Sequence, residues 1–184
     1  MALYASNSTL APEIRPTEDV DVVVESATYG GHSVLEERLR DLGFENDNIS
    51  GIICRYLIKG IVVDVMPVND NVFGFTNRWY TEGFGSAVDY KLDVDTTIKI
   101  FSLPYFIATK WEAFKGRGKG DYRTSKDFED IAYVIENAAD FVHIMEAAPS
   151  HLKQYFQQEF TGIIHTDDFE EGLYAHSSRG YGGG

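Results

Sequence analysis

The sequence predicts an α/β protein of the α+β kind, in which a small mixed β-sheet precedes a helical C-terminal region. Three observations indicate this fold class. Apolar runs with a period of two dominate the chain up to residue 101, a helical period follows from Pro104, and 43% of the 184 residues are apolar, enough for a sizeable core. We therefore expect a sheet core at 1–101, a helical region at 102–176 and a flexible tail at 177–184.

The first strand is predicted at 17–25, where valines at 20, 22 and 24 alternate with acidic residues. Such alternation turns the valines toward the core and the acids, among them Asp19 and Asp21, toward the opposite face. A second run of the same period, at 61–66, carries Asp64 between two valines. Pairing of these two strands brings a third carboxylate alongside the first two.

The remaining elements follow from periodicity and from helix and turn signals. Ser33 and Glu36 have capping-box spacing after the break at Gly30-Gly31, and Gly43 is suited to ending that helix in the left-handed conformation. Lys59-Gly60 has the length and composition of a hairpin loop. The expected elements are a helix at 33–42, hairpin strands at 52–58 and 61–66, a short helix near 77–82, strands near 88–92 and 96–101, and helices at 105–115, 125–137, 140–147, 151–164 and 167–176.

Composition excludes several classes of protein. No apolar stretch approaches the roughly 20 residues of a membrane helix, and the N-terminus lacks the layout of a signal peptide, so a cytoplasmic protein without membrane contact is expected. The lone cysteine, Cys54, lies in an apolar run and is expected to be a buried thiol. A net charge of −13 argues against nucleic-acid binding over the whole surface.

One segment is locally basic. It places five of the sixteen basic residues within positions 115–126, among several glycines; they are Lys115, Arg117, Lys119, Arg123 and Lys126. A flexible basic loop is suited to binding phosphate or an RNA backbone, and equally to serving as a solvated linker. Sequence gives the two interpretations similar weight.

The three aspartates form a compact oxygen-rich set if the strands pair as expected. Mg²⁺ selects such ligands when it also binds phosphate, and two bridged ions favour in-line phosphoryl transfer. Alternating acids are also common on solvent-facing strands, which is the more frequent explanation of an isolated Asp-x-Asp. Lys110 follows the helix start at Pro104 and is placed to reach a triphosphate, although most helix lysines are simply solvated.

Two further acidic residues, Asp127 and Asp130, lie three positions apart on the helix predicted at 125–137. Asp127, in its first turn, is explained most simply by the positive end of the helix dipole. For Asp130 the alternatives are a pair with Lys110, a pair with Arg123, or a place facing the site. The five histidines form no convincing metal-ligand set, and no spacing suggests a hydrolase triad.

An ordered set of motifs resembles bacterial nucleotidyltransferases of the AbiEii abortive-infection toxin type, within the DNA polymerase β-like superfamily. Each motif alone is loose, whereas their order over residues 1–137 is specific. The motifs are Arg15-Pro-Thr-x-Asp-Val-Asp21, Ile53-Cys-Arg-Tyr56, Val63-Asp-Val-Met-Pro67, Phe75-x-Asn-Arg-Trp-Tyr80, Tyr105-Phe-Ile-Ala-Thr-Lys-Trp-Glu-Ala-Phe-Lys-Gly-Arg-Gly-x-Gly-Asp121 and Ser125-Lys-Asp-Phe-Glu-Asp-Ile131.

The resemblance implies transfer of a nucleoside monophosphate from an NTP to an acceptor, with two Mg²⁺ ions. Asp19 and Asp21 match the metal ligands, and Asp64 matches the third carboxylate of the metal site, which helps to deprotonate the acceptor. Lys110 matches the phosphate-binding lysine. The resemblance further assigns nucleotide binding or its orientation to Arg15, Thr17, Lys115, Arg117, Asp127 and Asp130. The acceptor is left open between RNA, protein and a small molecule, and a toxin role implies an antitoxin protein as partner.

One departure from the family pattern affects the expected activity. Such proteins carry a Gly-Gly or Gly-Ser pair ten residues or more before the paired aspartates, after an opening helix and strand, and its backbone binds the triphosphate. Residues 1–5 resemble the helix that follows this pair, so the core is expected to lack its first helix and strand. The alternative to an active enzyme is therefore a truncated, non-catalytic module of the same fold that binds a nucleotide or a partner protein.

Overall fold

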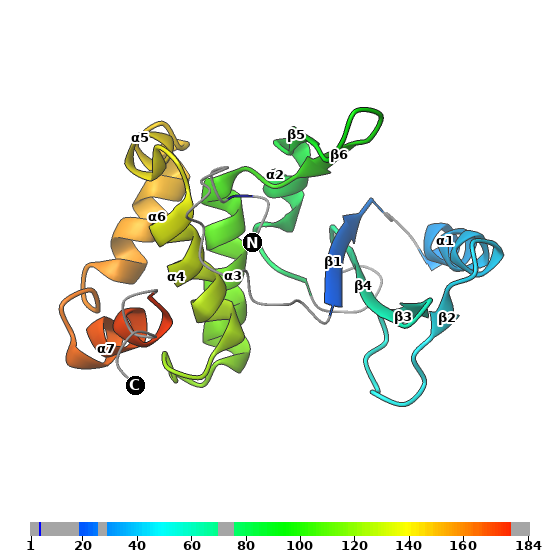
Figure 1. Cartoon of the computed structure of the whole chain (residues 1–184), viewed down its shortest axis with the longest axis horizontal. Helices are drawn as coiled ribbons and strands as arrows, with labels where there is room; N and C mark the ends of the chain where they lie inside the picture. Colours follow the sequence, from blue (N-terminus) through cyan, green and yellow to red (C-terminus); the bar gives the residue numbers. More distant parts are fainter. Residues whose placement is uncertain (1–3, 5–18, 26–28, 70–75, 178–184) are drawn as a thin grey trace. The chain divides into compact units, whose positions relative to one another are not determined.

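The computed structural model describes Tyr4 and residues 19–25, 29–69 and 76–177 (Figure 1). These residues form a mixed α/β protein, which confirms the predicted fold class. The chain divides into two compact units, Arg15–Gly85 and Ser86–Gly184, the second including Met1–Ile14. Strands β5 and β6 therefore belong to the unit that contains the C-terminal helices. No helix within the described ranges is long and apolar enough to cross a membrane.

The first unit is built on a four-stranded sheet with the order β1-β4-β3-β2. Strand β1 runs parallel to β4, while β3 is antiparallel to both β4 and β2. Helix α1 connects β1 to β2, and the short helix α2 is the last element of this unit along the chain. The elements are β1 Asp19–Val24, α1 Tyr29–Asp41, β2 Glu45–Asn46, β3 Arg55–Ile58, β4 Ile61–Pro67 and α2 Tyr80–Gly85.

One face of this sheet carries the core. Tyr56, Val63 and Val65 are buried there, and partly buried side chains from β1, α1 and the following turn pack against them. Val20 and Val22 remain 48% and 38% exposed, although the alternation predicted a buried valine face. Only the C-terminal end of β1, at Val24, joins this hydrophobic cluster. The buried face of β1 is thus shorter than its sequence pattern.

Helix α1 begins at Tyr29, four residues before the predicted start, so Gly30-Gly31 lies in its first turn and does not break the chain. Glycine costs a helix about 1 kcal/mol per residue, which packing of the later apolar turns can offset. The other end is as predicted: Gly43 has φ +89°, and the N–H of Phe44 donates to the carbonyl of Leu39 at 3.0 Å. This pairing is a Schellman motif, and both Phe44 and Leu39 pack into the core.

The hairpin between β3 and β4 is confirmed and fixes the register of the sheet. Lys59 and Gly60 have φ of 50° and 82°, the positive pair of a type I′ turn. Ile58 therefore pairs with Ile61, and the register continues to Arg55 opposite Asp64. This pairing determines which side chain stands beside the third aspartate. Cys54, next to the hairpin, is buried as predicted, and its burial raises the pKa of the thiol.

In the second unit, the described residues form a two-stranded antiparallel sheet and five helices. The predicted helices are all present, and α7 has the predicted bounds, whereas α6 ends four residues earlier than predicted. Ser125 caps α4 by accepting from the backbone N–H of Phe128. The elements are β5 Val88–Lys91, β6 Thr97–Ile100, α3 Leu103–Arg117, α4 Lys126–Asn137, α5 Phe141–Glu146, α6 Ser150–Phe160 and α7 Asp167–His176.

Aromatic rings hold these helices together. Phe128 of α4 is fully buried. Its ring centroid lies 5.5 Å from that of Phe114, 4.9 Å from that of Tyr122 and 5.4 Å from that of Phe169. Gly172 allows α7 to approach this cluster closely, because a Cβ at that position would lie 2.4 Å from the Cβ of Tyr122. The core of this unit therefore joins α3, α4, α7 and the loop before α4.

Candidate functional site

A row of charged side chains crosses three strands on the face of the first sheet opposite its core. Asp21 of β1 pairs with Asp64 of β4, and Asp64 pairs with Arg55 of β3. Residues that pair across neighbouring strands point to the same face, and Asp19, two residues before Asp21, shares it. The structure thus places the three predicted carboxylates on one face of one sheet. We call Asp19, Asp21, Asp64 and Arg55 the sheet cluster.

Arg55 is the member of the sheet cluster that the sequence analysis missed. Its Nε donates to one oxygen of Asp64 at 2.8 Å and its Nη2 donates to the other at 2.7 Å. The same Nη2 lies 3.9 Å from a carboxylate oxygen of Asp19. Hydrogen bonding to Asp64 raises the pKa of the Arg55 guanidinium further above its already high value, against the opposing effect of burial. A fixed positive charge therefore lies between two of the predicted metal ligands.

The residues present fit a divalent cation only in part. Carboxylate oxygens are suitable hard ligands for Mg²⁺, and Asp19 keeps an exposed side chain, 49% accessible. Asp64, by contrast, is 14% accessible and both of its oxygens accept from Arg55. Within the described part of the chain, no three His, Cys, Asp or Glu side chains are grouped closely enough to hold a metal ion. Asp19 and Asp21 are the residues best suited to such an ion.

A second charged group lies in the helical unit, between α3 and α4. Lys110 Nζ is 2.7 Å from a carboxylate oxygen of Asp130 and 3.7 Å from one of Asp127. Arg117 donates to both oxygens of Asp127 at 2.7 Å. We call Lys110, Arg117, Asp127 and Asp130 the helix cluster. Of the alternatives for Asp130, the structure selects the pair with Lys110.

The two carboxylates of the helix cluster are buried. The side chains of Asp127 and Asp130 are 5% and 10% accessible, and that of Lys110 is 18% accessible. The side chain of Arg117 is 73% accessible, so its guanidinium is held by Asp127 and still faces solvent. Buried carboxylates are stable as ions only with such partners. Asp127 thus holds a cation of α3, in addition to the helix-dipole role that its position suggested.

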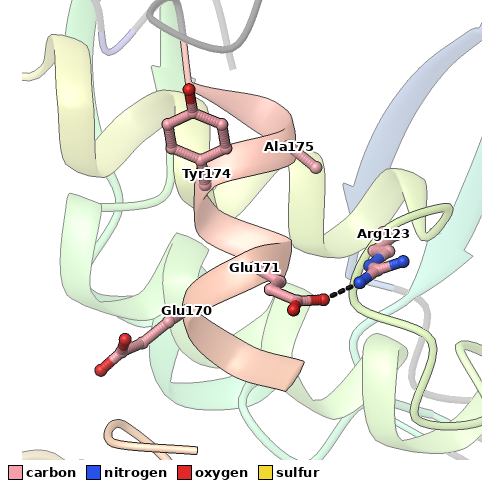
Figure 2. Close-up of a pocket in the computed structure, with 5 residues that line it drawn as sticks. All are labelled: Arg123, Glu170, Glu171, Tyr174 and Ala175. Carbon is pink, nitrogen blue, oxygen red and sulfur yellow. Dashed lines mark ion pairs between the residues drawn. The ribbon is translucent and has the colours of Figure 1, made fainter. Parts of the chain in front are cut away.

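Most of the basic segment at 115–126 is already paired with carboxylates. The Nζ of Lys115 lies 2.8 Å from a carboxylate oxygen of Glu159 and 3.1 Å from one of Glu112. Burial tends to lower the pKa of the Lys115 ammonium, but its hydrogen bonds to Glu159 and Glu112 outweigh this and raise it. Arg123 pairs with Glu171 of α7 (Figure 2). The segment is therefore less positive at the surface than its sequence suggests.

Figure 2 also shows the residues that surround a hollow at this ion pair. It is lined by Arg123, Glu170, Glu171, Tyr174 and Ala175. Of the described residues that the family resemblance assigns to nucleotide or metal binding, none lines it, and its two glutamates are unsuited to a triphosphate. The hollow is not the candidate site.

Two of the predicted nucleotide-binding residues, Arg15 and Thr17, lie outside the described residues. Of the others, the sheet cluster gathers the predicted metal ligands within the first unit, and the helix cluster gathers the four predicted phosphate-binding or orienting residues Lys110, Arg117, Asp127 and Asp130 within the second. Lys115 stands apart from the helix cluster, on the side of α3 that contacts α6.

Comparison with protein-family models finds no match, and comparison with curated proteins finds none either.

Proposed function

We propose that this protein is a nucleotidyltransferase that moves a nucleoside monophosphate from an NTP to an acceptor in a Mg²⁺-dependent in-line displacement. The observation that carries the proposal is the pairing of Asp21 with Asp64 on neighbouring strands, with Asp19 on the same face. Like charges placed side by side are destabilising, so a sheet that keeps three of them at one place is expected to use them. The motif order resembling AbiEii-type nucleotidyltransferases gives the same three residues this role.

Each residue has a separate task in this proposal. Bound Mg²⁺ would neutralise triphosphate charge and favour ionisation of the attacking hydroxyl. Asp19 and Asp21 would hold the ion, and Asp64, fixed in orientation by Arg55, would accept the proton of the acceptor. Within the helical unit taken by itself, Asp127 holds the solvent-facing guanidinium of Arg117 by two hydrogen bonds, an arrangement that is suited to phosphate.

The acceptor is proposed to be a protein or a small molecule. The net charge of −13 repels a polyanion, and Lys115, Arg117 and Arg123 are paired with carboxylates within the helical unit. RNA would need a larger free basic surface than these residues provide.

A second candidate is a non-catalytic module that binds a nucleotide or a partner protein. One observation favours it: both oxygens of Asp64, the expected proton acceptor, already accept hydrogen bonds from Arg55. Such a module would bind a nucleotide without releasing pyrophosphate.

The test is calorimetric titration of the full chain with each of the four NTPs, with and without Mg²⁺. We expect binding only with the metal, and loss of that binding in Asp21→Asn. Asp41→Asn is the matched control, because it makes the same chemical change at an exposed position on α1. Equal binding without Mg²⁺, or in Asp21→Asn, would contradict the proposal. Pyrophosphate release with protein and small-molecule acceptors then separates the enzyme from the non-catalytic module.

A further inference from the structure

The loop between β2 and β3 is longer than a hairpin requires. Strand β2 ends at Asn46 and β3 begins at Arg55, so residues 47–54 form the connection, whereas Lys59 and Gly60 alone connect β3 to β4. Most hairpin loops contain roughly two to five residues. Figure 1 shows the longer loop in cyan, extending beyond the ends of the two strands that it joins. We call residues 47–54 the isoleucine loop.

The apolar side chains of the isoleucine loop face solvent. Ile49 is 97% accessible, the highest value among the large apolar side chains that the structure describes, and Ile53 and Ile52 are 65% and 39% accessible. The chain returns to the core at Cys54, which is buried. Single exposed apolar side chains are ordinary on a protein surface, whereas clusters of them mark binding surfaces. Three isoleucines within five positions form such a cluster.

The polar groups of the isoleucine loop fix its shape. The carboxylate of Asp47 accepts from the backbone N–H groups of Ile49 at 2.9 Å and Ser50 at 3.1 Å, and the Ser50 hydroxyl accepts from the N–H of Ile52 at 3.2 Å. At the base of the loop, the N–H of Asp47 donates to the carbonyl of Arg55 at 3.0 Å. A side-chain hydrogen bond from Ser50 and the two backbone bonds lower the pKa of Asp47, so its carboxylate is ionised at neutral pH. A loop that is ordered before binding loses less conformational entropy when it binds.

The charge around the isoleucines is negative. Residues 41–54 include Asp41, Glu45 and Asp47 and contain no lysine or arginine, and the first two of these acids are exposed. The nearest basic residues along the chain are engaged elsewhere: Arg55 donates to the sheet cluster, and Arg40 donates to a backbone carbonyl of its own helix. The apolar surface therefore has an acidic border.

This border selects among the possible occupants. In a second copy of the chain, the same acids would face each other, and a net charge of −13 opposes self-association. The same charge opposes contact with an anionic lipid surface. A protein surface that is apolar at its centre and bordered by lysine and arginine matches both the isoleucines and the acids.

We infer that the isoleucine loop binds a partner protein, at an apolar surface of that protein bordered by lysine and arginine. Ile49 and Ile53 are the anchoring side chains, because they expose the largest fractions of their surface. Asp47 and Glu45 provide the complementary charge. The inference is independent of the proposed nucleotidyltransferase activity.

The probe is a synthetic helical peptide that carries leucines on one face and lysines on either side of them. Its binding to the full chain is measured by fluorescence anisotropy. We expect the double variant Ile49→Ser/Ile53→Ser to bind it about tenfold more weakly than the wild type, because two apolar anchors are lost. The matched control is Val94→Ser/Val142→Ser, which removes two exposed apolar side chains elsewhere and should bind as the wild type does.

Two further measurements separate the apolar contact from the charge. A peptide with serines in place of the leucines reports attraction to an acidic protein alone, and it should bind the wild type and Ile49→Ser/Ile53→Ser equally. Glu45→Gln should weaken binding of the leucine–lysine peptide about threefold, as for other partly exposed charge pairs. Glu146→Gln, an exposed change on α5, is its control and should have no effect.

The outcomes decide between the occupants. Equal affinity of the wild type and Ile49→Ser/Ile53→Ser for the leucine–lysine peptide would overturn the inference. Self-association in sedimentation equilibrium, or binding to phosphatidylcholine vesicles, that only the loop variant loses would assign the loop to a second copy or to lipid and also overturn it. Circular dichroism checks folding, and if the double variant does not fold, Ile49→Ser alone should weaken peptide binding about threefold. None of these measurements uses a nucleotide, so a negative result leaves the proposed function standing.

Discussion

The two charged clusters of this protein differ in balance and in burial. The helix cluster holds two acids and two bases, and its carboxylates are almost fully buried. The sheet cluster holds three acids and one base, and Asp19 is 49% accessible. Buried ions need matched partners, whereas a partly exposed surplus of one charge is tolerated at a cost in stability.

This difference indicates that the helix cluster supports the fold, whereas the sheet cluster is the proposed cation site. A balanced, buried network links α3 to α4 and leaves no charge for a ligand to neutralise, apart from the solvent-facing side of Arg117. In the sheet cluster, Asp21 and Asp64 are like charges paired on neighbouring strands, an arrangement that destabilises a sheet. Removing one charge should therefore have opposite effects on folding in the two clusters.

The largest effect is expected in the helix cluster. Asp127→Asn removes the charge partner of Arg117 and one of the two carboxylates near Lys110. Because this carboxylate is 5% accessible while Arg117 faces solvent, we expect the free energy of unfolding to fall by about 2 kcal/mol, the cost of losing charge-assisted hydrogen bonds at a buried acceptor. Urea denaturation measures the change. Asp95→Asn, an exposed change in the same unit, is the control and should stay within about 0.5 kcal/mol of the wild type. A loss below about 1 kcal/mol for Asp127→Asn would show that the cluster does not support the fold.

A smaller effect of opposite sign is expected in the sheet cluster. Asp21 and Asp64 are like charges directly paired across neighbouring strands, so Asp21→Asn should raise the free energy of unfolding by up to about 1 kcal/mol without metal. Urea denaturation in the presence of a chelator measures it, with Asp41→Asn for comparison. A clear destabilisation would mean that Asp21 supports the sheet, and the contrast between the clusters would fail.

The sequence predicted the parts of the sheet cluster that depend on local signals. The Lys59-Gly60 loop defines a two-residue turn, and counting back three pairs from Ile58 and Ile61 brings Arg55 opposite Asp64. Arg55 was therefore predictable from the hairpin. The pattern of acidic residues alone does not reveal Arg55, since only the hairpin register places it beside Asp64.

Other features depend on contacts between distant parts of the chain. Val20 and Val22 are exposed although they alternate like a buried face, because burial depends on what packs against the strand, which no local pattern contains. The start of α1 at Tyr29 was mispredicted because glycine is only a weak helix breaker within a first turn. The pair of Asp130 with Lys110 required the packing of α3 on α4, so sequence left three alternatives open.

The smallest effect concerns the loop that leads into α4. The carboxylate of Asp121 accepts from the hydroxyl of Thr124 at 2.6 Å and from the backbone N–H groups of Thr124 and Arg123, and these bonds lower the pKa of Asp121. A lowered pKa in the folded state stabilises the fold above the pKa of the unfolded chain, and this contribution is lost as the pH falls through the folded value. The stability difference between the wild type and Asp121→Asn should therefore be constant near pH 6 and shrink below about pH 4. Urea denaturation between pH 3 and pH 6 measures it. In Thr124→Val, which lacks the hydroxyl donor, substituting Asp121 should produce a weaker pH dependence, and a difference that stays constant down to pH 3 would contradict the assignment.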